Sequence, residues 1–305
     1  MSGNAALVGA QSISLVAPTL LLYAFLTIVS VLVAIKTRTA PNSMLRKQVF
    51  SWWFITPVLT AALFFYPIGM PALTLLICAL AAKELDALMP ARRWQFRLFY
   101  IVILVLTLMQ NYLPTTLYLA IFAVLFAALV FAFLKGPVAG VLIPLLFALT
   151  SFCIGTLMQF TNLPLYKGFG LFWLIYLLSV TAFNDVAQYI FGTLFGKQKI
   201  VKRISPNKTW QGLLGGVAIS VALSIVLGSY LRLAGVSVLI LLGLALSIGG
   251  FVGDILLSAA KRFLGIKDFS NLIPGHGGML DRVDSLIITA PLLYIVLQMT
   301  SIGFA

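Results

Sequence analysis

The segment from Val236 to Leu257, VSVLILLGLALSIGGFVGDILL, decides the kind of fold that this chain can adopt. A helix needs roughly 20 apolar residues to cross the hydrocarbon core of a bilayer, and this segment is apolar almost throughout. Its one charged residue, Asp254, lies near its C-terminal end. The segment therefore predicts a transmembrane helix that carries a carboxylate close to one membrane surface.

The composition of the whole chain indicates the same class of protein. Of its 305 residues, 62% are hydrophobic and 9% are charged, and the mean hydropathy is +1.11. A soluble domain of this length could not bury so much apolar surface. We therefore predict an all-α, polytopic membrane protein with about ten transmembrane helices. The predicted spans are residues 13–35, 49–69, 71–89, 98–113, 115–135, 141–160, 169–192, 212–233, 236–257 and 285–304.

The basic residues follow the loops between these spans. The net charge is +13, and alternating the loops across the membrane places all Lys and Arg except Lys167 and Arg232 on one side. The positive-inside rule makes that side cytoplasmic and puts both termini outside. Topology and contacts with lipid headgroups thus account for the charge, and no nucleic-acid partner is expected. Residues 1–12 contain no Lys or Arg, so we expect the first span to persist as a helix rather than to be cleaved as a signal peptide.

The acidic residues are few, and topology does not require them. None lies in a loop assigned to the outside, and Asp185 and Asp254 fall inside predicted spans. A charged side chain at the centre of a membrane costs about 2.5–3.5 kcal/mol on insertion scales, so such carboxylates are usually paired, bound to metal or hydrated. A structural ion pair between helices is one interpretation. Four aspartates near one membrane face favour a functional site. The complete set is Glu84, Asp86, Asp185, Asp254, Asp268, Asp281 and Asp284.

The segment ISPNKTWQG, residues 204–212, combines a turn with hydrogen-bond donors. Ser205 and Pro206 favour the turn, and Asn207, Lys208 and Thr209 precede the next span. Donors at the N-terminus of a helix suit a phosphate group. The alternative is an anchor at the membrane interface, where Trp and Lys are common.

The segment IPGHGGMLDRVDS, residues 273–285, gathers the chain's only histidine with glycines and two aspartates. The glycines on either side of His276 allow the backbone to approach a ligand closely. Asp281 and Asp284 are three residues apart, so on a helix they would share a face and could converge on one cation. Carboxylates favour Mg²⁺, whereas a lone histidine is poor evidence for zinc. No P-loop, nucleophile elbow or dinucleotide-binding motif is present in the sequence.

The run SAAKRFLGIKDFSNLIPGHGGMLDRVD, residues 258–284, resembles the signature of the phosphatidate cytidylyltransferase (CDP-diacylglycerol synthase) family. Ser, Lys-Arg, Lys-Asp, His-Gly-Gly and Asp-Arg-x-Asp all occur in the order of that signature. SPNKTW with GLLGG, and NDVAQYIFG with FGK, resemble two further blocks of the family. The resemblance covers about residues 170–290.

This resemblance implies a reaction, a cofactor and a location. CTP and phosphatidate, or a related lipid phosphate, would give CDP-diacylglycerol and pyrophosphate with Mg²⁺ and, in some sites, a second cation. The site would face the cytoplasm from a bacterial inner membrane and contact membrane lipids, and a homodimer is compatible with the sequence. Residues 1–165 would form N-terminal transmembrane helices, and residues 166–305 a catalytic transmembrane region with cytoplasmic loops.

The resemblance also implies roles for individual residues. The implied metal ligands are Asp254, Asp281, Asp284 and Asp185. The implied catalytic groups are Asp281, Asp254, Lys261, Arg282 and Lys208. The implied substrate-binding residues are Ser205, Asn207, Lys208, Ser258, Lys261, Gly275, His276, Gly277 and Gly278.

The chain departs from the family pattern at two positions. Members often carry Glu where this chain has Gln211 and Leu257. This indicates a divergent member or paralogue and leaves a different lipid phosphate open as the substrate. A secondary transporter is the alternative from another class, although it predicts internal repeats and a site near the middle of the bilayer. A CTP-dependent lipid kinase would not be expected to carry this signature.

Overall fold

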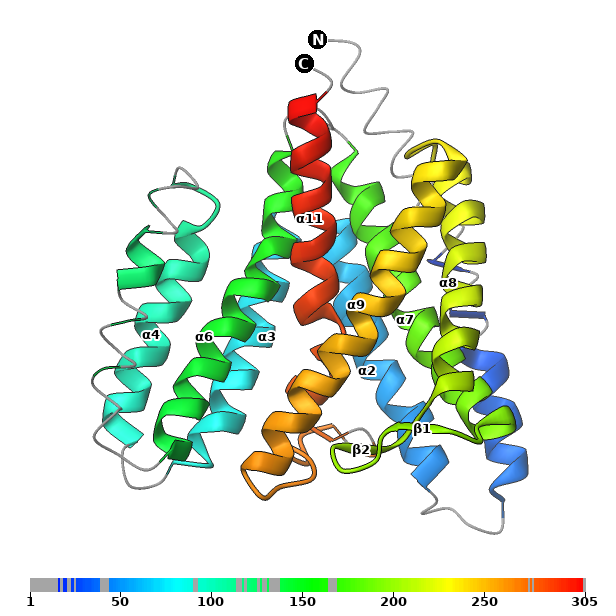
Figure 1. Cartoon of the computed structure of the whole chain (residues 1–305), viewed down its shortest axis with the longest axis horizontal. Helices are drawn as coiled ribbons and strands as arrows, with labels where there is room; N and C mark the ends of the chain where they lie inside the picture. Colours follow the sequence, from blue (N-terminus) through cyan, green and yellow to red (C-terminus); the bar gives the residue numbers. More distant parts are fainter. Residues whose placement is uncertain are drawn as a thin grey trace.

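The structure is a computed structural model of the chain, and it describes residues 26–38, 44–89, 93–113, 138–163, 169–273 and 277–303 together with a few positions between these ranges. Helices dominate, and the longer ones run alongside one another as a bundle (Figure 1). The helices are α2 (Met44–Phe64), α3 (Gly69–Asp86), α4 (Arg93–Met109), α6 (Val138–Gln159), η2 (Phe160–Asn162), α7 (Gly170–Phe195), α8 (Trp210–Tyr230), α9 (Val236–Phe263), α10 (Leu280–Val283) and α11 (Leu286–Gly303).

Four helical segments are long and apolar enough to cross a membrane by length and composition. They are Gly140–Asn162, Gly170–Phe195, Trp210–Tyr230 and Val236–Phe263. Shorter apolar helices include Val49–Phe64, Phe96–Met109 and Leu286–Met299. These findings agree with the predicted class of helical membrane protein. The predicted span 115–135 falls largely outside the described residues, so the total of ten spans stays a prediction.

A buried polar contact ties together the three helices that carry the site. Asn184 on α7 accepts hydrogen bonds at Oδ1 from Ser220 Oγ of α8 at 3.2 Å and from Ser247 Oγ of α9 at 2.6 Å. All three side chains are fully buried. Between apolar helices, such bonds between side chains help to fix the packing. The orientation of α7 is therefore set at the residue that precedes Asp185.

A short hairpin is the exception to the all-α prediction. Strands β1 (Lys199–Val201) and β2 (Ser205–Thr209) pair antiparallel, with Lys199 opposite Thr209. Proline is tolerated in β2 because both strands of a two-stranded sheet are edge strands. Thr209 then caps α8, because its Oγ1 accepts a hydrogen bond from Gly212 N at 3.1 Å. Lys208 thus lies at the end of β2, two residues before α8 begins.

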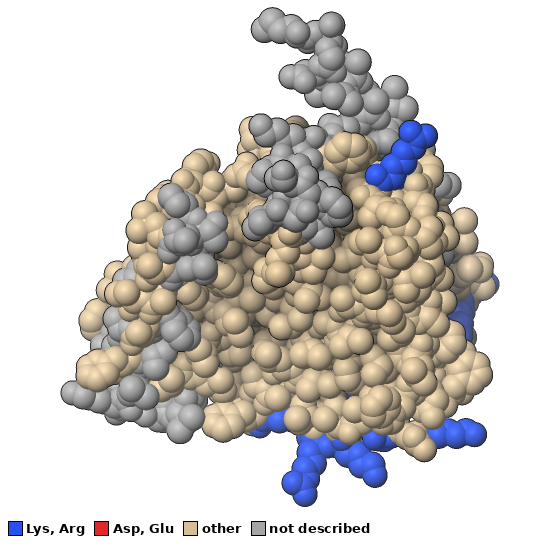
Figure 2. Space-filling view, turned by 45° about the horizontal axis from the view of Figure 1, so that its top comes forward, with Lys and Arg blue, Asp and Glu red and all other residues tan. Residues whose placement is uncertain are grey.

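The hairpin lies at the same end of the bundle as the last turns of α9 (Figure 1). Arg262 of α9 connects the two, because its Nε donates to the carbonyl oxygen of Ile204 at 3.2 Å. Figure 2 shows blue side chains gathered along this edge of the molecule. Exposed basic residues here include Lys199, Lys202 and Arg203. This basic end corresponds to the side that the sequence predicts to be cytoplasmic.

Candidate active site

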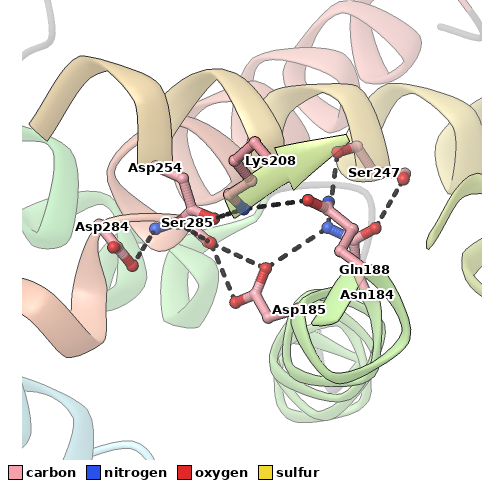
Figure 3. A network of polar contacts seen from close by, with 8 residues as sticks. All are labelled: Asn184, Asp185, Gln188, Lys208, Ser247, Asp254, Asp284 and Ser285. Atoms are coloured by element: carbon pink, nitrogen blue, oxygen red, sulfur yellow. Dashed lines mark hydrogen bonds and ion pairs between the residues drawn. The ribbon is translucent and has the colours of Figure 1, made fainter. Parts of the chain in front are cut away.

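Three carboxylates from different segments meet at Ser285 (Figure 3). Ser285 Oγ lies 3.0 and 2.9 Å from the two carboxylate oxygens of Asp185 on α7. It also lies 2.9 Å from Oδ1 of Asp254 on α9. Asp284 completes the group, because its Oδ1 accepts the backbone N–H of Ser285 at 2.9 Å. Asp185, Asp254, Asp284 and Ser285 are called the carboxylate cluster below.

The hydrogen atoms available in this cluster are too few for its oxygens. A serine hydroxyl carries one proton, yet Ser285 Oγ lies within 3.0 Å of three carboxylate oxygens. The hydroxyl can donate to only one of these oxygens at a time. In each of the other contacts, the hydroxyl oxygen faces a carboxylate oxygen with no proton between them. Burial and the neighbouring Asp254 and Asp185 carboxylates raise the pKa of Asp284 well above its usual value. The cluster is therefore an electronegative site that a cation would stabilise.

Lys208 brings a positive charge to one side of the cluster. Its Nζ donates to Asp254 Oδ2 and, at 3.0 Å, to Gln188 Oε1. It also lies over the ring of Phe251, 5.5 Å from the centroid. Because an ammonium group can only donate, Gln188 must turn its oxygen toward Lys208. Gln188 Nε2 is buried and has no hydrogen-bond partner among the described residues, which leaves a donor beside the cluster for a ligand oxygen.

Asp281 and Lys261 form a second group. Lys261 Nζ donates to Asp281 Oδ1 at 2.6 Å and lies 5.7 Å from the centre of the Phe269 ring. Asp281 Oδ2 accepts the backbone N–H groups of Phe269 at 3.2 Å and Gly278 at 2.8 Å. Both oxygens of Asp281 are thus engaged by protein donors. The assignment of Asp281 as a metal ligand stays a prediction.

The remaining predicted residues lie around these two groups. Ser258 and Lys261 follow Asp254 by four and seven residues on α9, which places the three on one helix face. Arg282 is exposed on α10, and on β2 Asn207 is exposed while Ser205 is half-buried. Their roles toward substrate stay predictions.

The glycine segment is a tight turn. Gly275 and Gly277 have φ angles of 77° and 80°, which only glycine adopts readily. The N–H of Ile273 donates to the carbonyl oxygen of Gly277 at 2.8 Å and closes the turn, and the next residue, Gly278, is buried. His276 lies outside the described residues, so its predicted contact with substrate stays a prediction.

The carboxylate oxygens of the cluster suit Mg²⁺ that is bound jointly by protein and substrate, rather than a metal ion held by protein side chains alone. Among the described residues, no three Asp, Glu, His or Cys side chains are arranged to hold a metal ion as they stand. Mg²⁺ is usually bound through one or two carboxylates, water and the phosphates of the substrate. The carboxylates of the cluster can supply oxygen ligands of this kind, because the Ser285 hydroxyl cannot donate a hydrogen bond to all of their oxygens. The cluster therefore fits a site that Mg²⁺ fills together with a phosphate ligand.

One prediction about the site can be compared with this geometry. Asp185, Asp254 and Asp284 do come together as one group. Ser285 and Gln188 were given no role from the sequence, although Ser285 ends the glycine-rich stretch and Gln188 lies three residues after Asp185. A polar residue inside a predicted span was the available signal for Gln188.

The close approach of α9 to the cluster predicts a sharp difference between two glycines. A methyl group added at Gly253 would overlap the backbone carbonyl oxygen of Asp284, whereas at Gly249 the nearest atom is Ile288 Cγ2 at 3.3 Å. We expect Gly253→Ala to lower stability by about 1–3 kcal/mol and to impair activity, because backbone must move. Gly249→Ala, one turn earlier, is the matched control and needs only a small shift of a side chain. Thermal unfolding of both variants in detergent tests this, and equal unfolding temperatures would contradict it.

The chain is similar in sequence to several known proteins. A sequence model described as the cytidylyltransferase family matches residues 46–300. The chain is 42% identical over 137 residues to a phosphatidate cytidylyltransferase of Brucella suis, covering 44% of this chain and 51% of that protein. It is 42% identical over 129 residues to a phosphatidate cytidylyltransferase of Staphylococcus haemolyticus, covering 42% and 50%.

A third relative carries no assigned activity in its name. The chain is 45% identical over 125 residues to the uncharacterized protein YnbB of Escherichia coli, covering 41% of this chain and 42% of that protein. In all three cases the matched part of the chain spans about half the length of the curated relative, or somewhat less.

Proposed function

The chain belongs to the cytidylyltransferase family, and on this premise we propose that it is a CTP-dependent phosphatidate cytidylyltransferase. The proposed reaction transfers CMP from CTP to the phosphate of phosphatidate and gives CDP-diacylglycerol and pyrophosphate. Relatives named phosphatidate cytidylyltransferase support the substrate pair. The observation that carries the proposal is the convergence of Asp185, Asp254 and Asp284 on Ser285 beside Lys208.

The chemistry asks the protein mainly to position two anions. An oxygen of the lipid phosphate forms a bond to the α-phosphorus of CTP, and the bond from that phosphorus to the oxygen bridging to the β-phosphate breaks. The electron pair leaves with pyrophosphate, so no covalent enzyme intermediate is needed. Bringing the reactants together and stabilising charge supplies the catalysis. We propose that Lys208 contributes to this stabilisation, and its contacts with Asp254 and Gln188 at the edge of the cluster support the proposal.

We propose that Asp185, Asp254 and Asp284 hold Mg²⁺ from the protein side. When bound, Mg²⁺ would neutralise charge on phosphate oxygens as a Lewis acid. Ser285 holds Asp185 and Asp254 at a common distance, and Gln188 can donate from Nε2 to a phosphate oxygen. Lys261, Arg282 and the Gly275–Gly278 turn are proposed to contact phosphates or nucleotide on the other side.

The location of the site supports a cytoplasmic orientation. The hairpin that carries Lys208 lies at the basic end of the bundle, and the positive-inside rule assigns such an end to the cytoplasm. CTP would reach the site from there, and the lipid would enter from the adjoining leaflet. In this proposal residues 166–305 carry the catalytic groups.

The competing functions differ in what they require. A transporter is not favoured by the family match, and Lys208, which contacts the cluster at Asp254, comes from the hairpin at the basic end of the bundle. A cytidylyltransferase for another lipid phosphate would use the same groups. The assay below separates these possibilities.

The test is transfer of radiolabelled CMP by the purified full-length protein in phospholipid nanodiscs. With α-labelled CTP, Mg²⁺ and phosphatidate, we expect label in CDP-diacylglycerol and release of one pyrophosphate per CDP-lipid. EDTA should abolish transfer and excess Mg²⁺ should restore it. Parallel reactions with a polyprenyl phosphate and with lysophosphatidate identify a different acceptor. If no phosphorylated lipid acquires label, the enzyme assignment is wrong.

A further inference from the structure

Glu84, on the last turns of α3, contacts the glycine-rich segment from the other half of the chain. Its Oε1 accepts hydrogen bonds from Ser270 Oγ and from the backbone N of Met279, both at 2.6 Å. Its Oε2 accepts the backbone N–H of Leu280 at 3.1 Å. Glu84 is only 4% exposed, so these protein donors replace the water that a carboxylate would otherwise bind.

The contact involves the part of the loop that leads into α10. A methyl group built at Gly278 would lie 2.7 Å from both carboxylate oxygens of Glu84, so the backbone passes directly over this side chain. The same Gly278 donates its N–H to Asp281 Oδ2. Three successive backbone N–H groups are therefore shared between two carboxylates. Gly278 donates to Asp281, whereas Met279 and Leu280 donate to Glu84.

The two carboxylates also hold the start of the loop. Asp281 accepts the N–H of Phe269, and Glu84 accepts the hydroxyl of the next residue, Ser270. Residues 269–280 are thus fastened at both ends by the same two side chains. Asp281 has a cationic partner in Lys261 at 2.6 Å, whereas the donors to Glu84 described above are a hydroxyl and two amides. Hydrogen bonds from neutral groups to a buried carboxylate are strong and directional, as a positioning contact requires.

We infer that Glu84 is a positioning residue for cytidylyl transfer, acting through the 269–280 loop and the start of α10. It touches neither substrate nor the carboxylate cluster; it fixes the backbone that carries Asp281 and leads to Asp284 and Ser285. The catalytic part of this inference rests on the proposed function. The structural part, that Glu84 orders the loop, stands without it.

The test compares Glu84→Gln and Glu84→Asp with Asp86→Asn in the full-length protein. Gln keeps the size of the side chain but turns an NH₂ group toward backbone donors, whereas Asp keeps the charge on a shorter stem. Asp86→Asn makes the same kind of change two residues away, at a side chain that is 20% exposed and pairs with the exposed Arg97 at 3.4 Å. Hydrogen exchange of the peptides covering residues 269–280 is measured first. We expect faster exchange there in Glu84→Gln, less change in Glu84→Asp, and none in Asp86→Asn.

Kinetics then measure the consequence for the reaction. We expect Glu84→Gln to lower kcat by about 10- to 100-fold, as misplacement of catalytic groups does, with partial recovery in Glu84→Asp. Unchanged exchange in Glu84→Gln, or faster exchange with wild-type kcat and KM for CTP, would overturn the inference. A uniform rise in exchange over the whole protein would also overturn it, because that is the result of global destabilisation. If the wild-type protein makes no CDP-lipid, the proposed function fails, and the exchange data still decide whether Glu84 orders the loop.

Discussion

Asp254→Asn is expected to lower CDP-lipid formation by about 10³-fold or more while leaving the protein folded. The substitution keeps the shape of the side chain and removes the charge that Lys208 and the proposed Mg²⁺ both require. Asp254 is also one of the two carboxylates that the Ser285 hydroxyl contacts. Loss of its charge therefore affects the lysine, the hydroxyl and the cation together.

The measurement is kcat at saturating CTP over a range of Mg²⁺ concentrations, together with thermal unfolding. We expect the variant to require more Mg²⁺ and to unfold within a few degrees of the wild type. Asp86→Asn serves as the control, because Asp86 lies on α3 outside the cluster and pairs at 3.4 Å with the exposed Arg97. A variant at Asp254 that kept a tenth of the wild-type rate would remove the metal-ligand assignment.

Asp281→Asn is expected to lose both activity and stability. The substitution breaks a pair in which the Asp281 and Lys261 side chains are only 6% and 12% exposed. Removing one partner of a buried ion pair costs about 3–5 kcal/mol, because the other charge is left without compensation. We expect turnover to fall by about 10²-fold or more, since the loop that Asp281 fastens includes the glycine turn.

A double variant separates the structural from the catalytic contribution of this pair. In Lys261→Met combined with Asp281→Asn, no buried charge is left unpaired, so part of the lost stability should return. Activity should stay low if either residue also contacts phosphate or metal. Recovery of activity together with stability would show that the pair is purely structural.

The membrane class could be predicted from the sequence. So could the closeness of Asp185, Asp254 and Asp284, although the predicted group also contains Asp281, which pairs with Lys261. A run such as Val236–Leu257 has one physical interpretation, because no soluble core could accommodate many such segments. Asp185 and Asp254 were informative for the same reason: a carboxylate in an apolar helix requires a partner. Both signals can be read from a short segment of sequence. The first reflects the free energy of exposing apolar surface to water, and the second that of placing a charge in an apolar helix.

The pairing of individual groups could not be predicted in this way. Asp281 and Asp284 were expected to share a helix face, but α10 ends at Val283, and their side chains go to different partners. In the sequence Glu84 is one of seven acidic residues and nothing marks its role, because its partners lie 186 to 196 residues further along the chain. The hairpin depends on pairing between two short strands that carry no alternating apolar pattern.

The separation between Glu84 and its partners has a consequence for how this protein is made. Met279 is synthesised 195 residues after Glu84, which at about 5–20 residues per second is a delay of roughly 10–40 seconds. During that interval α3 has left the ribosome, and the amides and hydroxyl that will bind its carboxylate do not yet exist. The end of this helix must therefore wait in water or at the lipid headgroups until the residues that bind Glu84 have been synthesised. The contacts between Glu84 and the 269–280 loop can therefore form only after the intervening helices have been made.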